Sequence, residues 1–281
     1  MYNKVFRIIS AIMKRLNQWK SSFAGVVSIV LLLLSVACSI VAFSPWGNFE
    51  PVVADKINNI LLGLAATFLG SIVTVCFVQA ILDKQNRKKE KLEERDKILR
   101  FDRVLSIILS RYKLYYNKVV TPLEGRNSVD AINLKTDFSF SDMRDLYKTT
   151  LLLKDKAYEP SIKLFYDTEK NLRKYMMQML ESIDFKYYNK MESVLIEFIE
   201  KSLTNDVSEA ILGNYELDKN MIVEIENYIA EEEKYQWLER MRNGELESNI
   251  MIPYIQLYRT LKLEANILNE YSDCKFKVLR S

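Results

Sequence analysis

Residues 57–82 read INNILLGLAATFLGSIVTVCFVQAIL, and none of them is Asp, Glu, Lys or Arg. A second uncharged stretch, SSFAGVVSIVLLLLSVACSIVAFSPWGNF, occupies residues 21–49 just before it. Charged residues make up 27% of the chain, so two neighbouring stretches of this length without any charged residue stand out from the rest of the sequence. A helix of about 20 apolar residues crosses the hydrocarbon core of a bilayer. The sequence therefore predicts a membrane hairpin over residues 21–82, with spans at about 23–43 and 59–81.

A cleaved signal peptide is the competing interpretation of the first stretch. Its apolar run is long for a signal core, and a long charged segment precedes it. Residues 35–38, Ser-Val-Ala-Cys, also resemble a lipoprotein cleavage box with lipid on Cys38, but Ser35 stands where leucine is expected. Membrane attachment follows in each case, because the second span remains.

Basic residues flank the predicted hairpin on both sides. Five precede the first span without any acidic residue, and after the second span a basic cluster outnumbers Asp83 and Glu90. The connecting loop carries Glu50, Asp55 and Lys56. Since Lys and Arg collect on the cytoplasmic side, this pattern predicts a multi-pass membrane protein with both termini in the cytoplasm and the short loop outside. The predicted membrane-surface basic residues are Lys4, Arg7, Lys14, Arg15, Lys20, Lys84, Arg87, Lys88 and Lys89.

Residues 1–20 also show helical periodicity of their apolar side chains. These are Val5, Ile9, Ile12, Leu16 and Trp19, and the basic residues lie mostly elsewhere on the helical wheel. A basic amphipathic helix of this kind binds an anionic bilayer surface with its apolar face down. We therefore expect a cytoplasmic surface helix in this segment.

The second span carries a stripe of small and hydroxyl-bearing residues at helical spacing. The stripe consists of Gly63, Ala66, Thr67, Gly70, Ser71 and Thr74. In lipid, small residues let helix backbones approach closely, and hydroxyl groups can hydrogen-bond across the contact. The stripe could pack on the first span of the same chain, or it could join copies of the chain in a homo-oligomer, for example around a pore. We favour the contact within the chain, because the two helices of a hairpin must pack on each other.

Beyond the hairpin the sequence predicts an all-α cytoplasmic domain. The chain has only 7 glycines and 5 prolines, which favours long helices. No helix breaker occurs between residue 82 and Pro122, so residues 83–121 are expected to form a charged stalk helix that continues the second span. Its apolar residues repeat in heptads: Ile98, Phe101, Leu105, Ile108, Tyr112, Tyr115 and Val119.

Residues 122–281 are expected to form an irregular bundle of about six helices. We expect a loop over residues 125–140, followed by helices over about 141–155, 160–180, 184–203, 206–213, 218–244 and 253–271. Capping residues such as Ser141, Asp206 and Asp218, and stop signals such as Gly213 and Gly244, set these bounds.

The composition argues against an enzyme. Histidine is absent, which removes the usual general base and the commonest metal ligand. Cys38, Cys76 and Cys274 lack metal or redox spacing, and the glycines are too far apart for a phosphate-binding loop. We therefore expect no catalytic residues, no cofactor and no metal site.

The charge balance argues against direct nucleic-acid binding. From Asp83 onward, 34 basic and 35 acidic residues leave a net charge of −1, whereas a duplex-binding surface needs a basic patch. One region is acidic, and it is either a solvated helix surface or a docking face for a basic partner. Its residues are Glu224, Glu226, Glu231, Glu232, Glu233, Glu239, Glu245 and Glu247.

The order of these parts resembles that of the two-span membrane effectors encoded beside reverse transcriptases in bacterial retrons, and of related abortive-infection proteins. The resemblance implies an anti-phage protein held inactive by partner proteins, including a reverse transcriptase nucleoprotein, and then released to damage the inner membrane or arrest growth. It also implies that the stripe permits reassembly in the membrane and that the stalk transmits the trigger. The rival expectations are a membrane-anchored helical adaptor or scaffold, and a regulatory subunit of a transport apparatus.

Overall fold

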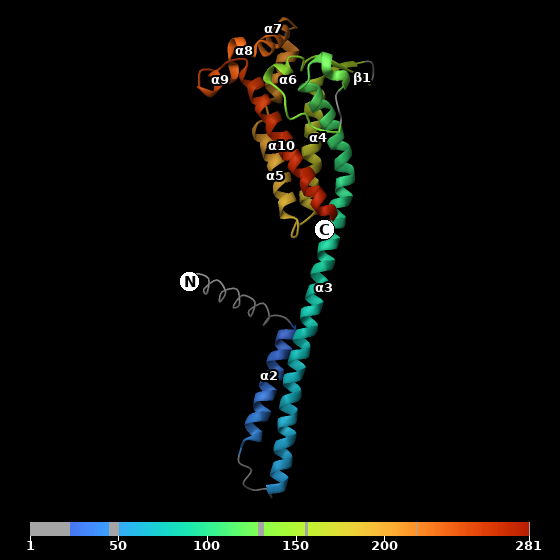
Figure 1. Cartoon of the computed structure of the whole chain (residues 1–281), viewed down its shortest axis with the longest axis vertical. Coiled ribbons are helices and arrows are strands. Elements are labelled where there is room, and N and C mark those ends of the chain that lie inside the picture. The colour runs from blue at the N-terminus through green and yellow to red at the C-terminus, as the bar shows by residue number, and fades with distance from the viewer. Residues whose placement is uncertain (1–22, 45–50, 129–131, 155–156, 218, 281) are drawn as a thin grey trace. The chain divides into compact units, whose positions relative to one another are not determined.

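The chain forms two compact units in a computed structural model, Met1–Glu90 and Lys91–Ser281 (Figure 1). The structure describes residues 23–44, 51–128, 132–154, 157–217 and 219–280. Helices dominate both units, so the prediction of an all-α protein is confirmed. The predicted surface helix over residues 1–20 lies outside the described residues.

The first unit contains helix α2 (Phe23–Ala42) and the first part of helix α3 (Pro51–Val119). Pro51 suits the first turn of α3, because the amide that proline lacks would have no partner there. No proline follows until Pro122, and α3 continues as one helix beyond the uncharged stretch, as predicted. Among the described residues, these two helices are long and apolar enough to cross a membrane.

The second unit is a helical bundle with one small sheet. After the last part of α3 come two 3-10 helices, two strands and seven α-helices: η1 (Leu123–Ser128), η2 (Phe140–Met143), β1 (Thr149–Lys154), β2 (Ala157–Pro160), α4 (Ser161–Ser182), α5 (Asn189–Thr204), α6 (Ser208–Leu217), α7 (Lys219–Ala230), α8 (Glu232–Tyr235), α9 (Trp237–Arg242) and α10 (Ile252–Arg280).

The core of the second unit lies where α3, α4, α5 and α10 face one another. Helix α10 packs most extensively on α5, and α5 also packs on α4. The largest fully buried side chains are aromatic: Tyr112, Tyr116, Phe140, Phe165, Phe185, Phe198, Tyr254 and Tyr271. Burial of these large rings, together with the many buried aliphatic side chains, drives the folding of this unit.

The buried face of α3 differs from the predicted heptad at every second position. Ile98, Leu105, Tyr112 and Val119 are buried, but Phe101, Ile108 and Tyr115 are only half-buried. The residues that follow them, Asp102, Leu109 and Tyr116, are buried instead. The heptad assumes one partner helix, whereas α3 contacts α4 and α10 together, which rotates its buried face.

The described residues 132–139 between η1 and η2 are irregular, as predicted, and are held by side chains of α3. Asn117 is buried, donates from Nδ2 to the Asn133 carbonyl (2.7 Å) and accepts from the Lys135 amide (2.9 Å). Tyr116 also donates to the Lys135 carbonyl (3.2 Å). Side-chain hydrogen bonds thus replace regular secondary structure as partners of this backbone.

The predicted helix over residues 141–155 is wrong. Only η2 forms there, a turn follows over residues 144–148, and Thr149–Lys154 is strand β1, which pairs antiparallel with β2 through Thr149 opposite Pro160 and Lys154 opposite Ala157. Two adjacent threonines favour a strand, because the β-branched side chain restricts its own rotamers in a helix. Pro160 then ends the strand and caps α4, as its fixed φ allows.

The predicted long helix over residues 218–244 is broken into α7, α8 and α9. Gln236 adopts the left-handed conformation (φ 51°) between α8 and α9. The break lets Tyr235 stack on Trp237, with ring centroids 5.2 Å apart, while Tyr228 packs edge-on against Trp237. Residues two apart on a continuous helix do not face each other, so this aromatic cluster requires the interruption.

Other helix bounds differ in smaller ways. Helix α5 begins at Asn189 rather than near residue 184, because Phe185 has a positive φ of 49° and is buried. Helix α6 passes through Gly213 to Leu217, and α10 continues past Tyr271 to Arg280. The last turns of α10 bury Cys274 and Val278, and this packing stabilises the longer helix.

The left-handed residue in the interrupted segment provides a test of this arrangement. Gln236→Gly is expected to raise the free energy of unfolding by up to about 1 kcal/mol, because glycine has no Cβ to clash at positive φ. Gln236→Val is expected to lower it by about 1–2 kcal/mol, because a β-branched residue is rarely found there. Thermal unfolding of the detergent-solubilised chain, followed by circular dichroism, measures both. A valine variant as stable as the parent would contradict the break at this residue.

Candidate functional site

Helix α2 packs on the first part of α3 through small residues. Gly25, Ser28, Ser35 and Ala42 are buried there, and Ala65 is the buried residue of the facing part of α3. The Ser35 hydroxyl donates to the Ala65 carbonyl at 3.1 Å, a hydrogen bond between the two helices. Small residues allow this close approach of two helices in lipid. The spacing of these small residues along the first apolar stretch could have predicted this contact from the sequence.

The predicted stripe on the second span lies on a different side of α3 from α2. Gly63, Ala66, Thr67, Gly70 and Thr74 are exposed, and only Ser71 is half-buried. A Cβ atom added at Gly63 or Gly70 would meet no heavy atom within 4 Å. Our preference for packing of this stripe on the first span is therefore wrong.

The hydroxyl groups of the stripe are bonded within α3. Thr67 donates to the Gly63 carbonyl (2.8 Å), Ser71 to the Thr67 carbonyl (2.9 Å) and Thr74 to the Gly70 carbonyl (3.0 Å). Each donor is satisfied by the residue four positions earlier, which is a common arrangement in membrane helices. The stripe is consequently a narrow, small-residue surface with no polar donor left unpaired.

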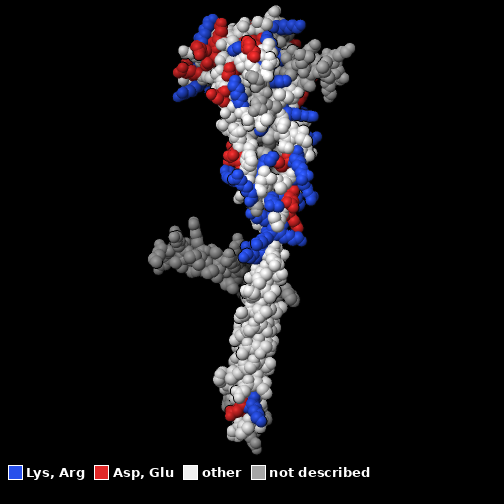
Figure 2. Space-filling model, turned by 45° about the vertical axis from the view of Figure 1, so that its right-hand side comes forward, with Lys and Arg blue, Asp and Glu red and all other residues white. Residues whose placement is uncertain are grey.

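The basic residues that follow the second span are exposed. Lys84, Arg87, Lys88 and Lys89 lie on α3 directly after the uncharged stretch, and no described residue covers them. Figure 2 shows the uncharged surface of the helical pair and the Lys and Arg side chains that follow it. The other predicted basic residues, Lys4, Arg7, Lys14, Arg15 and Lys20, lie outside the described residues.

A polar cluster is buried in the core of the second unit. Glu264 of α10 is fully buried and accepts a hydrogen bond at Oε2 from the Tyr112 hydroxyl of α3. Its other oxygen, Oε1, has no hydrogen-bond partner among the described residues. Glu169 of α4 is also buried, and its Oε1 lies 3.4 Å from Arg173 Nη1. The cluster joins three helices around two carboxyl groups and a single guanidinium.

Both carboxyl groups prefer to be protonated. Burial raises the pKa of Glu264 to about 7, although the Tyr112 hydrogen bond and Arg173 oppose the shift. Burial, followed by the nearby Glu264 carboxyl, raises the pKa of Glu169 well above its usual value, and Arg173 again opposes. A neutral carboxylic acid can be buried at far lower cost than a carboxylate.

A second polar contact of α3 lies nearer the start of the second unit. Asp102 is buried, lies 2.7 Å from Lys275 Nζ and accepts a hydrogen bond from the Tyr271 hydroxyl at 3.0 Å. Together with the Tyr112–Glu264 bond, it fixes the register of α3 against α10. Polar contacts of this kind make sliding of the helices costly, because a shift would leave buried charges unpaired.

The acidic side chains of the second unit differ in their exposure. The buried carboxyl pair is closed to solvent, so a substrate has no access to it. Within the described ranges, no group of three or more His, Cys, Asp or Glu side chains could hold a metal ion. The acidic residues of α7, α8 and α9 are mostly exposed, but Glu226 is buried and pairs with Lys148 at 2.7 Å. Glu226 therefore does not belong to the predicted acidic face.

The chain matches no model of a known protein family, no curated protein and no solved structure.

The buried carboxyl pair predicts a pH dependence of stability. The pKa of Glu264 is raised in the folded state, so the folded chain holds a proton that the unfolded chain releases between about pH 4.5 and pH 7. Stability is therefore highest below this window and falls as pH rises through it, by about 3 kcal/mol for a shift of this size.

Glu264→Gln is expected to remove that fall, because the amide cannot ionise and still accepts the Tyr112 hydrogen bond. Urea unfolding at pH 5 and pH 8 measures the difference between variant and parent. Glu247→Gln is the matched control, because Glu247 is exposed. Equal pH dependence in all three chains would show that Glu264 is not protonated in the fold.

Proposed function

We propose that this chain is an inner-membrane effector of a bacterial anti-phage system of the retron or abortive-infection type. In this proposal both termini lie in the cytoplasm, and partner proteins hold the chain inactive. On release, copies of the chain associate in the bilayer and damage the membrane or arrest growth. The order of parts supports the proposal, and so does the surface that the second span leaves uncovered.

The uncovered stripe is the observation that carries the proposal. A hairpin that serves only as an anchor needs one close-packed contact, and α2 already supplies it through Ser35 and Ala65. A second small-residue surface on another side of α3, from Gly63 to Thr74, has no described partner. Small residues at lipid-facing positions give up apolar contact with lipid, and association with another helix compensates for it.

Helix α3 supports the proposal in a second way. It contains the stripe and also the residues Asp102 and Tyr112 that fix its register against α10. A partner that alters the packing of α10 on α3 would therefore act on the helix that carries the stripe. No flexible loop interrupts the path between the two sets of residues.

The second candidate function is a membrane-anchored adaptor or scaffold. The exposed glutamates of α7, α8 and α9 favour it, because they could bind a basic partner protein. A regulatory subunit of a transport apparatus belongs to the same class. An adaptor uses the hairpin only as an anchor, so it would be harmless when expressed alone.

Expression of the chain alone in a bacterial host distinguishes the candidates. An effector is expected to collapse the membrane potential, measured with a potential-sensitive dye, and to stop growth. Gly70→Leu is expected to restore growth, because the leucine side chain blocks close approach of another helix at the stripe. Within one chain the leucine has room, since an added Cβ at Gly70 meets nothing within 4 Å.

Ala80→Leu is the matched control for this variant. Ala80 is also exposed on α3, but it lies outside the stripe and faces a different direction on the helix. Growth arrest by Ala80→Leu and its loss in Gly70→Leu would support the stripe as the contact. Equal toxicity of both variants would contradict the proposed role of the stripe, and harmless expression of the parent would favour the adaptor.

The proposed topology has its own test. Protease added to intact spheroplasts is expected to leave residues 91–281 undigested, because they lie in the cytoplasm. After the spheroplasts are opened, the same protease should digest them. Carbonate washing should leave the chain in the membrane fraction, as two spans require. Digestion in intact spheroplasts, or release by carbonate, would contradict the hairpin.

A further inference from the structure

In the second unit, helix α3 carries a line of residues on the side that faces away from the core. This outer line follows alternating intervals of three and four and consists of Lys97, Arg100, Val104, Ile107, Arg111 and Leu114. The first five are exposed and Leu114 is half-buried. The core meets α3 on the other side, at residues such as Ile98, Leu105 and Tyr112. Alternation of three and four is the spacing at which one helix packs along another.

The middle of the outer line is apolar. Val104 is 45% exposed and Ile107 is 61% exposed. They are neighbours on the helix surface, and the half-buried Ile108 extends this apolar surface toward the core. Covering such a surface with apolar side chains of another helix releases its water at a gain in free energy.

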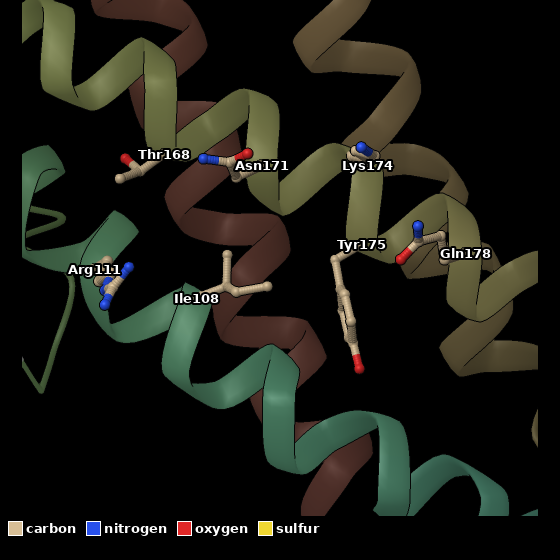
Figure 3. A pocket seen from close by; sticks show the side chains of 7 residues that line it. All are labelled: Ile108, Arg111, Thr168, Asn171, Lys174, Tyr175 and Gln178. Carbon is tan, nitrogen blue, oxygen red and sulfur yellow. The ribbon is translucent and has the colours of Figure 1, made fainter.

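The outer line borders a hollow of about 350 Å³ between α3 and α4. Ile108 and Arg111 line the hollow from α3, and Tyr175 lines it from α4 (Figure 3). The ring of Tyr175 packs against Phe101 of α3, with centroids 5.9 Å apart, which holds this wall of the hollow in place. A helix packed on the outer line could insert one of its side chains into the hollow, as knobs fit into holes between packed helices.

Positive charge surrounds the apolar middle of the outer line. Residues 97–119 of α3 contain six basic residues and one acidic residue, Asp102. Asp102 is buried and pairs with Lys275, so it does not neutralise the exposed basic side chains of α3. The three basic residues of the outer line form no ion pair with any residue that the structure describes. The outer line therefore offers apolar contact between unpaired cations.

A second copy of this chain is a poor match for the outer line. Two outer lines packed in parallel about a two-fold axis would place Arg100 against Arg100 and Arg111 against Arg111, and like charges repel. A nucleic-acid strand would pair with the arginines but would leave Ile107 exposed to water. A helix with Asp or Glu side chains satisfies both needs, because carboxylates bind guanidinium groups through two N–H donors and the rest of the helix can be apolar.

We propose that the outer line is the docking site for an acidic amphipathic helix of a partner protein. The partner helix covers Val104 and Ile107 with apolar side chains and presents Asp or Glu to Arg100 and Arg111. One of its apolar side chains enters the hollow beside Ile108. The inference goes beyond the proposed function, because it concerns the second unit and does not depend on what the hairpin does.

Fluorescence anisotropy tests the proposal with the purified full-length chain in phosphatidylcholine nanodiscs. The probe is a labelled synthetic peptide of several heptads, with leucine at positions a and d and glutamate at positions e and g. It is expected to bind with a Kd below about 100 μM at low salt, and more weakly as salt screens the charges. Ile107→Asp is expected to weaken binding about tenfold or more, since it places a charge in the apolar contact. Arg100→Glu combined with Arg111→Glu is expected to have an effect of similar size, because it reverses both charges.

Matched controls separate the outer line from other exposed residues of the second unit. Ile196→Asp changes an exposed isoleucine of α5, and Lys170→Glu reverses an exposed charge of α4. Both variants should bind the peptide as the parent does. A second peptide, with lysine in place of every glutamate, should not bind.

Three results would overturn the proposal. The first is no binding of the glutamate peptide, and the second is equal binding of the lysine peptide. The third is unchanged binding in Ile107→Asp, which would show that the apolar middle of the outer line takes no part. If a single-stranded oligonucleotide binds more tightly than the glutamate peptide and Ile107→Asp leaves its binding unchanged, the outer line is a nucleic-acid surface instead.

Discussion

The hydrocarbon core of a bilayer excludes charges and unpaired backbone groups, and two helices of this chain have the length and composition to meet that constraint. Residues 21–49 and 57–82 carry no charge, and α2 (Phe23–Ala42) and the first part of α3 (Pro51–Val119) pair their own backbone groups. Charged residues resume at Asp83, within the same helix α3. One helix therefore contains both the apolar contact with α2 and the polar contacts with α10.

Buried polar groups give the second unit its specificity, whereas burial of aromatic and aliphatic side chains gives it stability. The rings of Tyr112, Phe165 and Phe198 pack together, and such packing tolerates small shifts of the helices. The bonds from Tyr112 to Glu264 and from Tyr271 to Asp102 do not tolerate shifts, because each would leave a buried group unpaired. The polar contacts thus select one register of α3 against α10.

Functional interpretation depends on surfaces that the fold leaves uncovered. On α3 these are the small-residue stripe and the basic residues after the uncharged stretch. Each has a chemistry that fits a different neighbour: another helix in lipid for the stripe, and an anionic headgroup for the basic residues.

The amino-acid sequence by itself determined the all-α class, the two apolar helices and the continuity of α3. Those features follow from composition and from the absence of charge or proline, which act locally. Only the tertiary structure decided that α2 packs through Ser35 rather than against the stripe, that Leu109 replaces Ile108 in the core, and that the helix before Trp237 breaks at Gln236. Small residues look alike in a sequence whichever side of the helix meets a partner. Likewise, the two threonines at the start of β1 favour a strand, but only the structure shows the pairing with Ala157–Pro160 that forms it.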